Sequence, residues 1–393
     1  MKPSLLVLAS TFPANPNDGT PAFVLDLALR EAVRYDVTVL TPRVAGAARR
    51  EVIDGVSVVR YPYFFKPFED LASGAILDNL KARKSRWLQV PALMLGLALA
   101  LRAEVRRLRP AAIHAHWVIP QGLVAAIFAP KVPLVVTTHG GDIYALNQGP
   151  LLALKRWVFG KAARITTVNR QMSERLVSLG VPADKIAVLP MGVDTKSVAK
   201  QVDGVSAVEG QLLVVGRLVE KKGIGYLFEA IRSGKLNSRL RVKVIGDGPM
   251  RAELEVLAEG LAVEFLGQRG RSEVLAAIAE SQLMAIPSVT AASGDQEGLP
   301  VTLLEGAAGG IAVIASRLPG IDEVIVHEQS GLLVEQRDVV GLASAIERLL
   351  DDRKLRERLA RGIAEAAKAY DLDVIGEAYC EQIALATRKS GNG

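Results

Sequence analysis

Short apolar runs recur along the whole chain, and stretches with helical spacing separate most of them. Each run spans three to five residues, as expected for strands that are buried on both faces of a sheet. The runs are Leu5–Ala9, Val37–Thr41, Ile113–Ala115, Leu134–Thr138, Ile165–Val168, Leu212–Val215, Val242–Ile245, Val263–Leu266, Met284–Pro287 and Ala312–Ala315. The helical stretches include Ala22–Arg34, Gln171–Leu179, Tyr226–Ile231 and Val339–Leu350. This alternation predicts an α/β fold with parallel sheets.

The length of the chain predicts two domains, because 393 residues are many for one core. The segment Gln201–Gly210 is small, polar and without periodicity, so we expect it to link domains 1–200 and 201–372. Neither half contains a complete G-x-G-x-x-G or G-x-x-x-x-G-K-[ST] motif. The sequence therefore lacks the motifs that would indicate a dinucleotide-binding site or a P-loop nucleotide site.

The single cysteine, Cys380, excludes a disulfide within the chain and favours a reducing compartment. The first apolar run lacks the length and the cleavage site of a signal peptide. The longest apolar run, Val90–Leu101, has 12 residues, fewer than a helix needs to span a bilayer. We therefore expect a cytoplasmic protein.

Charge is distributed unevenly. Residues 1–200 hold 26 Lys and Arg against 14 Asp and Glu, a net charge of +12, whereas the remainder carries −6. A basic half predicts an anionic neighbour such as a membrane surface, a phosphorylated acceptor or nucleic acid. The cations are not interleaved with aromatic residues, so we expect no nucleic-acid partner.

One basic segment brackets the apolar run Val90–Leu101. Its cations are Lys81, Arg83, Lys84 and Arg86 before the run and Arg102, Arg106, Arg107 and Arg109 after it. Such a segment can lie in the interface of an anionic bilayer, which would place the protein at the inner face of the plasma membrane. The alternative is a core helix with a solvated basic end.

Two carboxylates bracket the stretch Glu297-Gly-Leu-Pro-Val-Thr-Leu-Leu-Glu305. Pro300 suits the first position of a helix, which places Glu297 in the preceding loop and Glu305 in the second turn. The entry Gly298-Leu299-Pro300 allows close approach to a helix N-terminus, which favours phosphate. The layout fits a nucleotide sugar, with hydroxyls on both sides of a diphosphate. The alternative is an acid that favours the helix dipole and an unrelated surface glutamate.

Further candidate residues follow other predicted strands. Arg217 and Lys222 can clamp a diphosphate or form a solvated basic loop. Gly19 can bring backbone N–H groups near a phosphate or belong to a plain capping loop. His139 precedes two glycines and is either open to a ligand or bonded within its loop. His114 and His116 lack a third metal ligand, which favours histidines bonded within a loop. Because the chain has no Asp-x-Asp near a strand end, we expect no metal and no bound cofactor.

Taken in order, these motifs resemble the retaining glycosyltransferases of family 4, which have the two-domain GT-B fold. The resemblance covers essentially the whole chain, and its most specific part runs from Ser288 to Glu305. Further matches are Gly216-Arg217, Lys222-Gly223, Gly246-Asp-Gly-Pro249, Phe265-Leu-Gly267 and Ser330-Gly-Leu-Leu-Val334. The subset it resembles uses nucleotide sugars in exopolysaccharide or lipid-linked glycan assembly.

The resemblance implies two doubly wound Rossmann-like domains that face a central cleft, with the last helix, Asp373–Arg388, returning to the N-terminal domain. It implies that Glu297 contacts sugar hydroxyls, Glu305 the ribose hydroxyls, and Arg217 and Lys222 the diphosphate of a nucleoside-diphosphate sugar. Gly19 would cover the diphosphate, and His139 would face the donor sugar. The acceptor would be a sugar or a lipid-linked sugar, and no metal would be needed.

The chain departs from the family pattern at Gly306 and Gly309-Gly310, which we expect to loosen the end of their helix. Two other functions remain open. One is a nucleotide-sugar epimerase or a phosphorylase of the same fold. An epimerase would consume the donor without an acceptor, and a phosphorylase could carry a lysine-bound cofactor. A non-catalytic nucleotide-sugar-binding protein would tolerate loss of His139.

Overall fold

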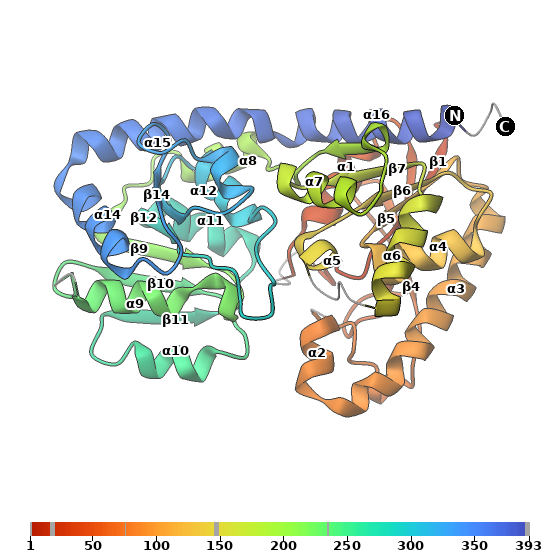
Figure 1. Ribbon diagram of the computed structural model, residues 1–393, viewed down its shortest axis with the longest axis horizontal. Helices are drawn as coiled ribbons and strands as arrows, with labels where there is room; N and C mark the ends of the chain where they lie inside the picture. Colours follow the sequence, from red (N-terminus) through yellow and green to blue (C-terminus); the bar gives the residue numbers. More distant parts are fainter. Residues whose placement is uncertain (1, 16–19, 75, 145–148, 234–235, 390–393) are drawn as a thin grey trace. The chain divides into compact units, whose positions relative to one another are not determined.

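The chain forms two compact units. The computed structural model describes residues 2–15, 20–74, 76–144, 149–233 and 236–389. Unit 1 is Met1–Leu189 with Ile375–Gly393, and unit 2 is Pro190–Val374 (Figure 1). The segment Gln201–Gly210, expected to be an unstructured linker, instead ends α8 (Thr195–Val202) and begins β9 (Val208–Val215). The boundary therefore lies at Leu189, ahead of the residue 200 expected from the sequence.

Unit 1 is built on a sheet of eight strands in the order β3-β4-β2-β1-β5-β6-β7-β8. The pairs are parallel except the hairpin of β3 and β4. The strands are β1 (Ser4–Leu8), β2 (Asp36–Pro42), β3 (Arg50–Ile53), β4 (Val56–Tyr61), β5 (Ala112–His116), β6 (Leu134–Thr137), β7 (Arg164–Thr167) and β8 (Ile186–Val188). The apolar runs predicted β1, β2, β5, β6 and β7 but missed β3, β4 and β8.

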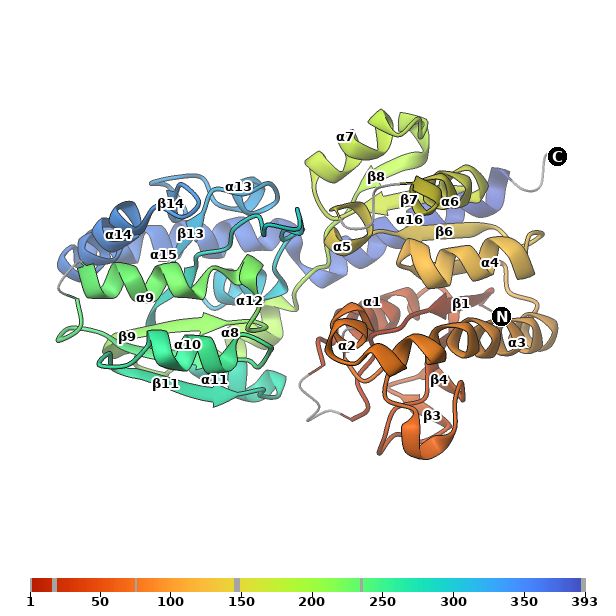
Figure 2. The ribbon, with the colours of Figure 1, turned by 60° about the horizontal axis from the view of Figure 1, so that its bottom comes forward.

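Helices cover both faces of the unit 1 sheet. They are α1 (Phe23–Glu31), α2 (Ile76–Ala82), α3 (Gln89–Leu108), α4 (Leu123–Phe128), α5 (Gly140–Tyr144), α6 (Gly149–Lys161), α7 (Arg170–Ser178) and, from Ile375, α16 (Leu372–Lys389). Leu5 and Val7 of β1 share a core cluster with residues of α1 and α16. Leu6 and Leu8 alternate with them and are equally buried, so they face the opposite side. Figure 2 shows α3 and α4 side by side in this unit.

Unit 2 is built on six parallel strands in the order β11-β10-β9-β12-β13-β14. With β9 they are β10 (Arg241–Ile245), β11 (Val263–Gly267), β12 (Ser281–Ile286), β13 (Ala312–Ser316) and β14 (Leu332–Val334). With α8 the helices are α9 (Ile224–Ser233), α10 (Arg251–Leu257), α11 (Arg271–Glu280), α12 (Val301–Ala308), α13 (Ile321–Val324), α14 (Val339–Asp351) and α15 (Arg353–Ala367). The apolar runs predicted every one of these strands except β14.

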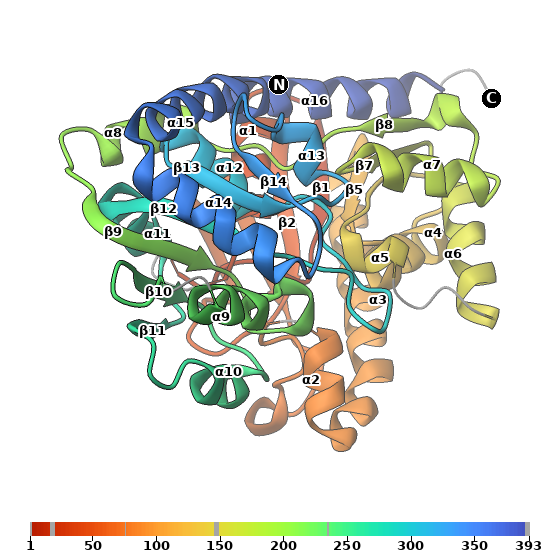
Figure 3. The same cartoon turned by 60° about the vertical axis from the view of Figure 1, so that its left-hand side comes forward.

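Side chains of β9 alternate between two core layers of unit 2. Leu212 and Val214 pack in the layer that contains α9 and α14, whereas Leu213 packs in the layer that contains α11 and α12. Figure 3 shows α9 and α14 in front of this sheet, with α11 and α12 behind it. Because both faces are covered, the strands read as continuous apolar runs in the sequence.

The strand order of each sheet reverses at one point. In unit 2 the reversal lies between β9 and β12, and in unit 1 it lies between β1 and β5. Connections leave such a point in opposite directions, which opens a crevice beyond the carboxyl ends of the two strands. We therefore expect ligand-binding residues in the loops that follow β9 and β12 in unit 2 and β1 and β5 in unit 1.

The helix α3 has one buried face and one exposed face. Leu93, Leu97 and Leu101 are buried, whereas Leu95 and Leu99 are largely exposed. Among the described residues, one helical stretch, Lys84–Leu108, is long and apolar enough to cross a membrane by length and composition alone. Because α3 packs against β2, β4 and α4, it serves as a covering helix of unit 1.

This division of α3 predicts unequal effects of two similar substitutions. Leu97→Ala should lower the free energy of unfolding of unit 1 by about 2–5 kcal/mol, because it leaves a cavity in the core. Leu95→Ala should change that free energy by less than about 0.5 kcal/mol. Urea unfolding of the two variants measures the difference, and equal effects would contradict the packing of α3.

Candidate functional site

The loops that follow four neighbouring strands of unit 2 are joined by backbone hydrogen bonds. After β9, Leu218 receives a hydrogen bond from Met250 and donates one to Asp247, both in the turn that follows β10. Gly246 in that turn donates to the carbonyl of Gly267, at the end of β11. Val289, after β12, donates to the carbonyl of Lys221. The ends of β9, β10, β11 and β12 therefore form one continuous rim.

Two glycines allow this rim to close around Lys222. Gly216 has a φ of +155°, and a Cβ there would lie 2.8 Å from Cε of Lys222. Gly223 has a φ of +62°, and a Cβ there would lie 1.9 Å from the carbonyl oxygen of Pro287. A larger residue at Gly223 would force the two loops apart, and one at Gly216 would displace the end of the Lys222 side chain. The sequence around Lys222 thus brings its side chain against the first residues after β9.

Lys222 forms an ion pair with Glu297. Its Nζ lies 3.2 Å from Oε1 of Glu297, and the side chains are 16% and 10% exposed. Lys221 pairs in parallel with Asp295 at 3.1 Å. The loops after β9 and β12 are therefore linked by two ion pairs at the point where the strand order reverses.

The charges around Glu297 are predominantly positive. Burial alone would raise the pKa of Glu297, but Lys222, Lys221 and Arg217 outweigh it, so its pKa lies below the usual range. Partial desolvation lowers the pKa of Arg217, while Asp295 and Glu297 act to raise it. An arginine remains charged after such a shift. The carboxylates of Glu297 and Asp295 therefore lie among three cations, so the group has a net positive charge and can still accept a negatively charged ligand.

Glu305 lies one helix turn beyond the entry of α12. The helix begins at Val301, with Pro300 as its N-cap, one residue later than the first helical position predicted for Pro300. Glu305 is the fifth residue of α12, in its second turn, and is 7% exposed. Its Oε1 lies 3.6 Å from Nε of Arg271 at the start of α11. Gly298 and Leu299 are partly buried and lie between the two glutamates.

In unit 1, His139 follows β6 and lies in an aromatic cluster. Its ring stacks on His116, with centroids 5.5 Å apart, and lies 4.7 Å from Trp117 and 5.2 Å from Phe23. The His116 Nδ1 and the His139 Nε2 are 3.3 Å apart. Burial lowers the pKa of His139 to about 3, and the charge of His114 acts in the same direction. His139 is therefore a neutral imidazole, suited to hydrogen bonding with hydroxyl groups.

Asp142 holds the loop that carries His139. Its carboxylate accepts hydrogen bonds from the backbone N–H of His139 at 2.9 Å and of Val118 at 3.2 Å. Lys155 donates to the Asp142 carbonyl at 2.7 Å. Val118 follows Trp117, so one buried side chain connects the loops after β5 and β6. Asp142 stands in the motif His139-Gly-Gly-Asp142, and its position was the only sequence signal for this role.

His114 belongs to the interior of unit 1. Its two ring nitrogens contact Glu31 and Thr137, each at 2.6 Å, and all three side chains are buried. Among the described residues, no three His, Cys, Asp or Glu side chains converge as a metal site. The predicted phosphate-covering residue Gly19 lies outside the described residues. The remaining predicted site residues fall into two groups, with His139 in unit 1 and the others in unit 2.

Two family sequence models match the chain in succession. The one described as Glycosyltransferase Family 4 matches residues 18–197, and the one described as Glycosyl transferases group 1 matches residues 199–366. The chain belongs to glycosyltransferase family 4. The two sheets with reversing strand order are the Rossmann-like domains of the GT-B fold, which the sequence predicts. Glu297, Arg217 and Lys222 lie within the second match.

Three known proteins illustrate the similarity. The amylovoran biosynthesis glycosyltransferase AmsK of Erwinia amylovora is 33% identical over 197 residues, which are 49% of this chain and 48% of AmsK. This chain thus spans about half the length of the curated relatives that it matches first. The solved structure of sucrose-phosphate synthase from Thermosynechococcus elongatus has a TM-score of 0.76 and 20% identity, covering 97% of this chain and 98% of that one. Anabaena HepE, solved with UDP and glucose, has a TM-score of 0.71 and 17% identity, covering 97% and 99%.

The burial of Asp142 predicts a pH-dependent contribution to the stability of unit 1. Burial raises the pKa of Asp142 from 3.8 to about 7, so the fold favours the protonated carboxyl. The contribution of the protonated carboxyl to the free energy of unfolding is fully present below pH 3.8 and is lost as the pH rises through about 7. Asp142→Asn cannot ionise, so its stability should fall less between pH 4 and pH 8 than that of the unsubstituted protein. Urea unfolding across this range tests the slope, and parallel curves would contradict the assignment.

Proposed function

We propose that this protein transfers a sugar from a nucleoside-diphosphate sugar to an acceptor hydroxyl, with retention of the anomeric configuration and without a metal ion. The observation that carries the proposal is the meeting of Arg217, Lys222 and Glu297 at the strand reversal of unit 2. This is the position at which sheets of this kind bind ligands. HepE, which shares the fold, was solved with UDP and glucose.

The cations can stabilise the diphosphate as it leaves. When the bond between the sugar and the diphosphate breaks, negative charge accumulates on the diphosphate oxygens. Lys222 and Arg217 are already in place beside Glu297, and α12 directs its first N–H groups toward the Gly298–Pro300 entry. Such preorganised groups stabilise the transition state more than the ground state. We propose that they take the place of a metal ion.

The two glutamates would contact opposite ends of the donor. Glu297 would contact sugar hydroxyls. Glu305, which pairs with Arg271, would contact the ribose hydroxyls. Gly298, Leu299 and Gly19 would contact the donor through their backbone. His139, a neutral imidazole, would face the donor sugar and accept or donate a hydrogen bond. An epimerase or a phosphorylase of the same fold would act without a sugar acceptor, which product analysis distinguishes.

We also propose the setting of the reaction. AmsK is named for amylovoran biosynthesis, which supports a role in exopolysaccharide or lipid-linked glycan assembly with a sugar or lipid-linked acceptor. The enzyme would work in the cytoplasm, in peripheral contact with the anionic inner face of the plasma membrane. A thermal-shift screen of UDP-, GDP- and ADP-sugars would identify the donor, since a ligand at about 100 times its Kd stabilises a protein by about 2.7 kcal/mol. Product NMR would then establish the anomeric configuration.

The first prediction of this proposal concerns the cations. Arg217→Ala and Lys222→Ala should each lower kcat/KM by about 100-fold or more, because each removes a preorganised charge beside the leaving group. Arg353→Ala, which removes an exposed arginine of α15, is the matched control and should leave kcat/KM unchanged. The unsubstituted enzyme should keep its activity in a chelator. Near-normal turnover of both site variants, or activity that needs added magnesium or manganese, would refute this part of the proposal.

The second prediction separates the two glutamates. Glu305→Gln should weaken binding of the free nucleoside diphosphate by about tenfold or more, because hydrogen bonds to a charged group are worth about 1.5–3 kcal/mol. Glu297→Gln should slow sugar transfer and have a smaller effect on free nucleotide, which lacks the sugar. Titration calorimetry with the nucleoside diphosphate, beside turnover measurements, compares the variants. The opposite pattern would exchange the two roles.

A further inference from the structure

Ten large apolar side chains are exposed on neighbouring parts of unit 1. We call them the apolar face: Phe65, Phe68, Trp87, Leu88, Leu95, Leu99, Ile127, Phe128, Leu151 and Trp157. The short helix Lys84–Leu88 leads directly into α3, α3 packs against α4, and α4 packs against α6. Single exposed apolar residues need no explanation, but a set on adjacent elements marks a site of interaction.

The spacing along α3 places its exposed leucines on one side. Leu95 and Leu99 are 60% and 62% exposed and four residues apart, which is the spacing of one helix face. Leu88, at the end of the short helix Lys84–Leu88 and seven residues before Leu95, is 75% exposed. The buried leucines of α3 occupy the opposite face, where they cover the sheet. The exposed leucines are thus not needed by the core of unit 1, and a partner outside the chain can bury them.

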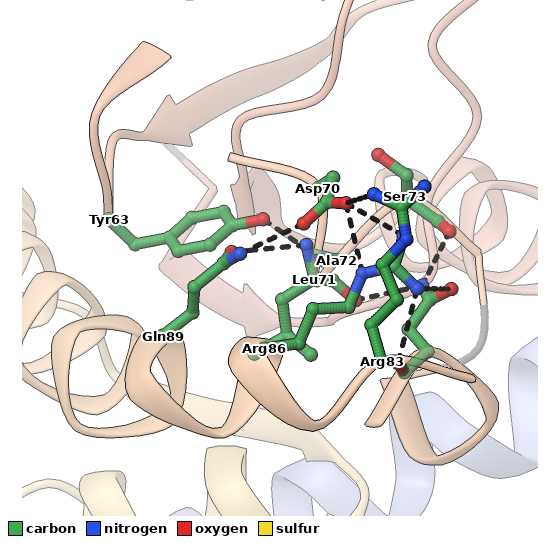
Figure 4. A network of polar contacts seen from close by, with 9 residues as sticks. Tyr63, Asp70, Leu71, Ala72, Ser73, Arg83, Arg86 and Gln89 are labelled. Carbon is green, nitrogen blue, oxygen red and sulfur yellow. Dashed lines mark hydrogen bonds and ion pairs between the residues drawn. The ribbon is translucent and has the colours of Figure 1, made fainter. Parts of the chain in front are cut away.

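A polar network fixes the two segments that carry the aromatic residues of this face. Asp70 accepts hydrogen bonds from Arg86 at 2.7 Å and 2.9 Å and from Gln89 at 2.9 Å (Figure 4). Gln89 in turn accepts from the backbone N–H of Leu71 at 3.2 Å. The Tyr63 hydroxyl accepts from the backbone N–H of Ala72 at 2.9 Å. The segment 63–72 is therefore bound to the start of α3, with Phe65, Phe68 and Trp87 left exposed.

The charge on α3, α4, α6 and their connections is almost entirely positive. The segment 63–72 adds Lys66 and two acids, Glu69 paired with Arg43 and Asp70 paired with Arg86. Residues 81–161 hold 12 Lys and Arg but only two acidic residues, Glu104 and Asp142, and both are buried. Exposed cations follow or accompany the apolar side chains on α3, after α4 and on α6: Arg102, Arg106, Lys131, Arg156 and Lys161. The surface thus combines exposed apolar side chains with cations that can bind phosphate headgroups.

We infer that the apolar face binds an anionic lipid bilayer. The tryptophans, phenylalanines and leucines enter the boundary between headgroups and acyl chains, and the neighbouring cations contact the lipid phosphates. A second copy of the chain is a poorer occupant, because pairing through this face would bring cations against cations. The inference rests on the membrane contact in the proposed function and assigns it a surface, but it is independent of the donor and of the reaction.

The experiment is co-sedimentation of the full chain with vesicles of phosphatidylcholine, with and without phosphatidylglycerol. The protein should bind vesicles that contain phosphatidylglycerol at low salt, bind them less at high salt, and bind neutral vesicles weakly. Arg102→Gln with Arg106→Gln should weaken binding about 30-fold, since each cation contributes about fivefold at such a surface. Leu95→Ser with Leu99→Ser should weaken it at least tenfold, through lost apolar burial.

The matched controls lie on unit 2. Val256→Ser with Val340→Ser removes two apolar side chains that are exposed to a similar degree, and Lys354→Gln with Arg361→Gln removes two exposed cations. Both control proteins should bind vesicles like the unsubstituted chain. All four variants should keep the circular dichroism spectrum and the nucleoside-diphosphate affinity of the unsubstituted chain, which separates a failure of this inference from a failure of the proposed transfer reaction.

Three results would overturn the inference. The first is equal binding to neutral and anionic vesicles, or no binding at low salt. The second is normal vesicle binding by both Arg102→Gln with Arg106→Gln and Leu95→Ser with Leu99→Ser. The third is a dimer in sedimentation velocity that Leu95→Ser with Leu99→Ser dissociates while vesicle binding stays unchanged, which would assign the face to a second copy.

Discussion

The reversal of strand order between β9 and β12 is the constraint on which the candidate site depends. The connections leave these two strands in opposite directions, and backbone hydrogen bonds and the Lys222–Glu297 ion pair hold the loops after them together. Lys222 and Glu297 are partly desolvated, and each would be costly to bury without the other. A diphosphate that enters this group would meet charges already fixed in position, so little reorganisation would be needed when it leaves.

Much of the fold follows from residue patterns, because strands buried on both faces must be apolar at every position. The missed hairpin of β3 and β4 shows the limit of that pattern. β3 is exposed or half-buried along its length, so it contains no apolar run. Its signal is the turn Asp54-Gly55, where both residues have positive φ, at 47° and 90°. That is the preferred sequence of a tight hairpin turn, and it identifies β3 by its connection and not by its composition.

The candidate site likewise has a part that could be expected from the sequence and a part that could not. Arg217, Lys222 and Glu297 were expected at one site because of the resemblance to family 4. Their strands, β9 and β12, are neighbours in the sheet although β10 and β11 lie between them in sequence. The pairing of Arg271 with Glu305 could not be expected, since it depends on how α11 and α12 pack. Gly306 is a related case. It was expected to loosen α12, but a Cβ there would lie 2.5 Å from Sδ of Met284, so the glycine lets the helix approach β12 closely. A residue that weakens a helix in isolation here permits its tertiary packing.

The helix α3 shows why a uniform apolar run is ambiguous in sequence. A helix that covers a sheet needs one apolar face, and polar residues on the other face normally reveal its orientation. In Val90–Leu101 both faces are apolar, so periodicity cannot distinguish a core helix from a membrane-binding one. The structure shows that α3 has features of both: Leu93 and Leu97 support the sheet, while Leu95 and Leu99 are exposed. Exposed leucines lower solubility without adding to the core, and the proposed contact with a lipid surface would give Leu95 and Leu99 a role that the core does not supply.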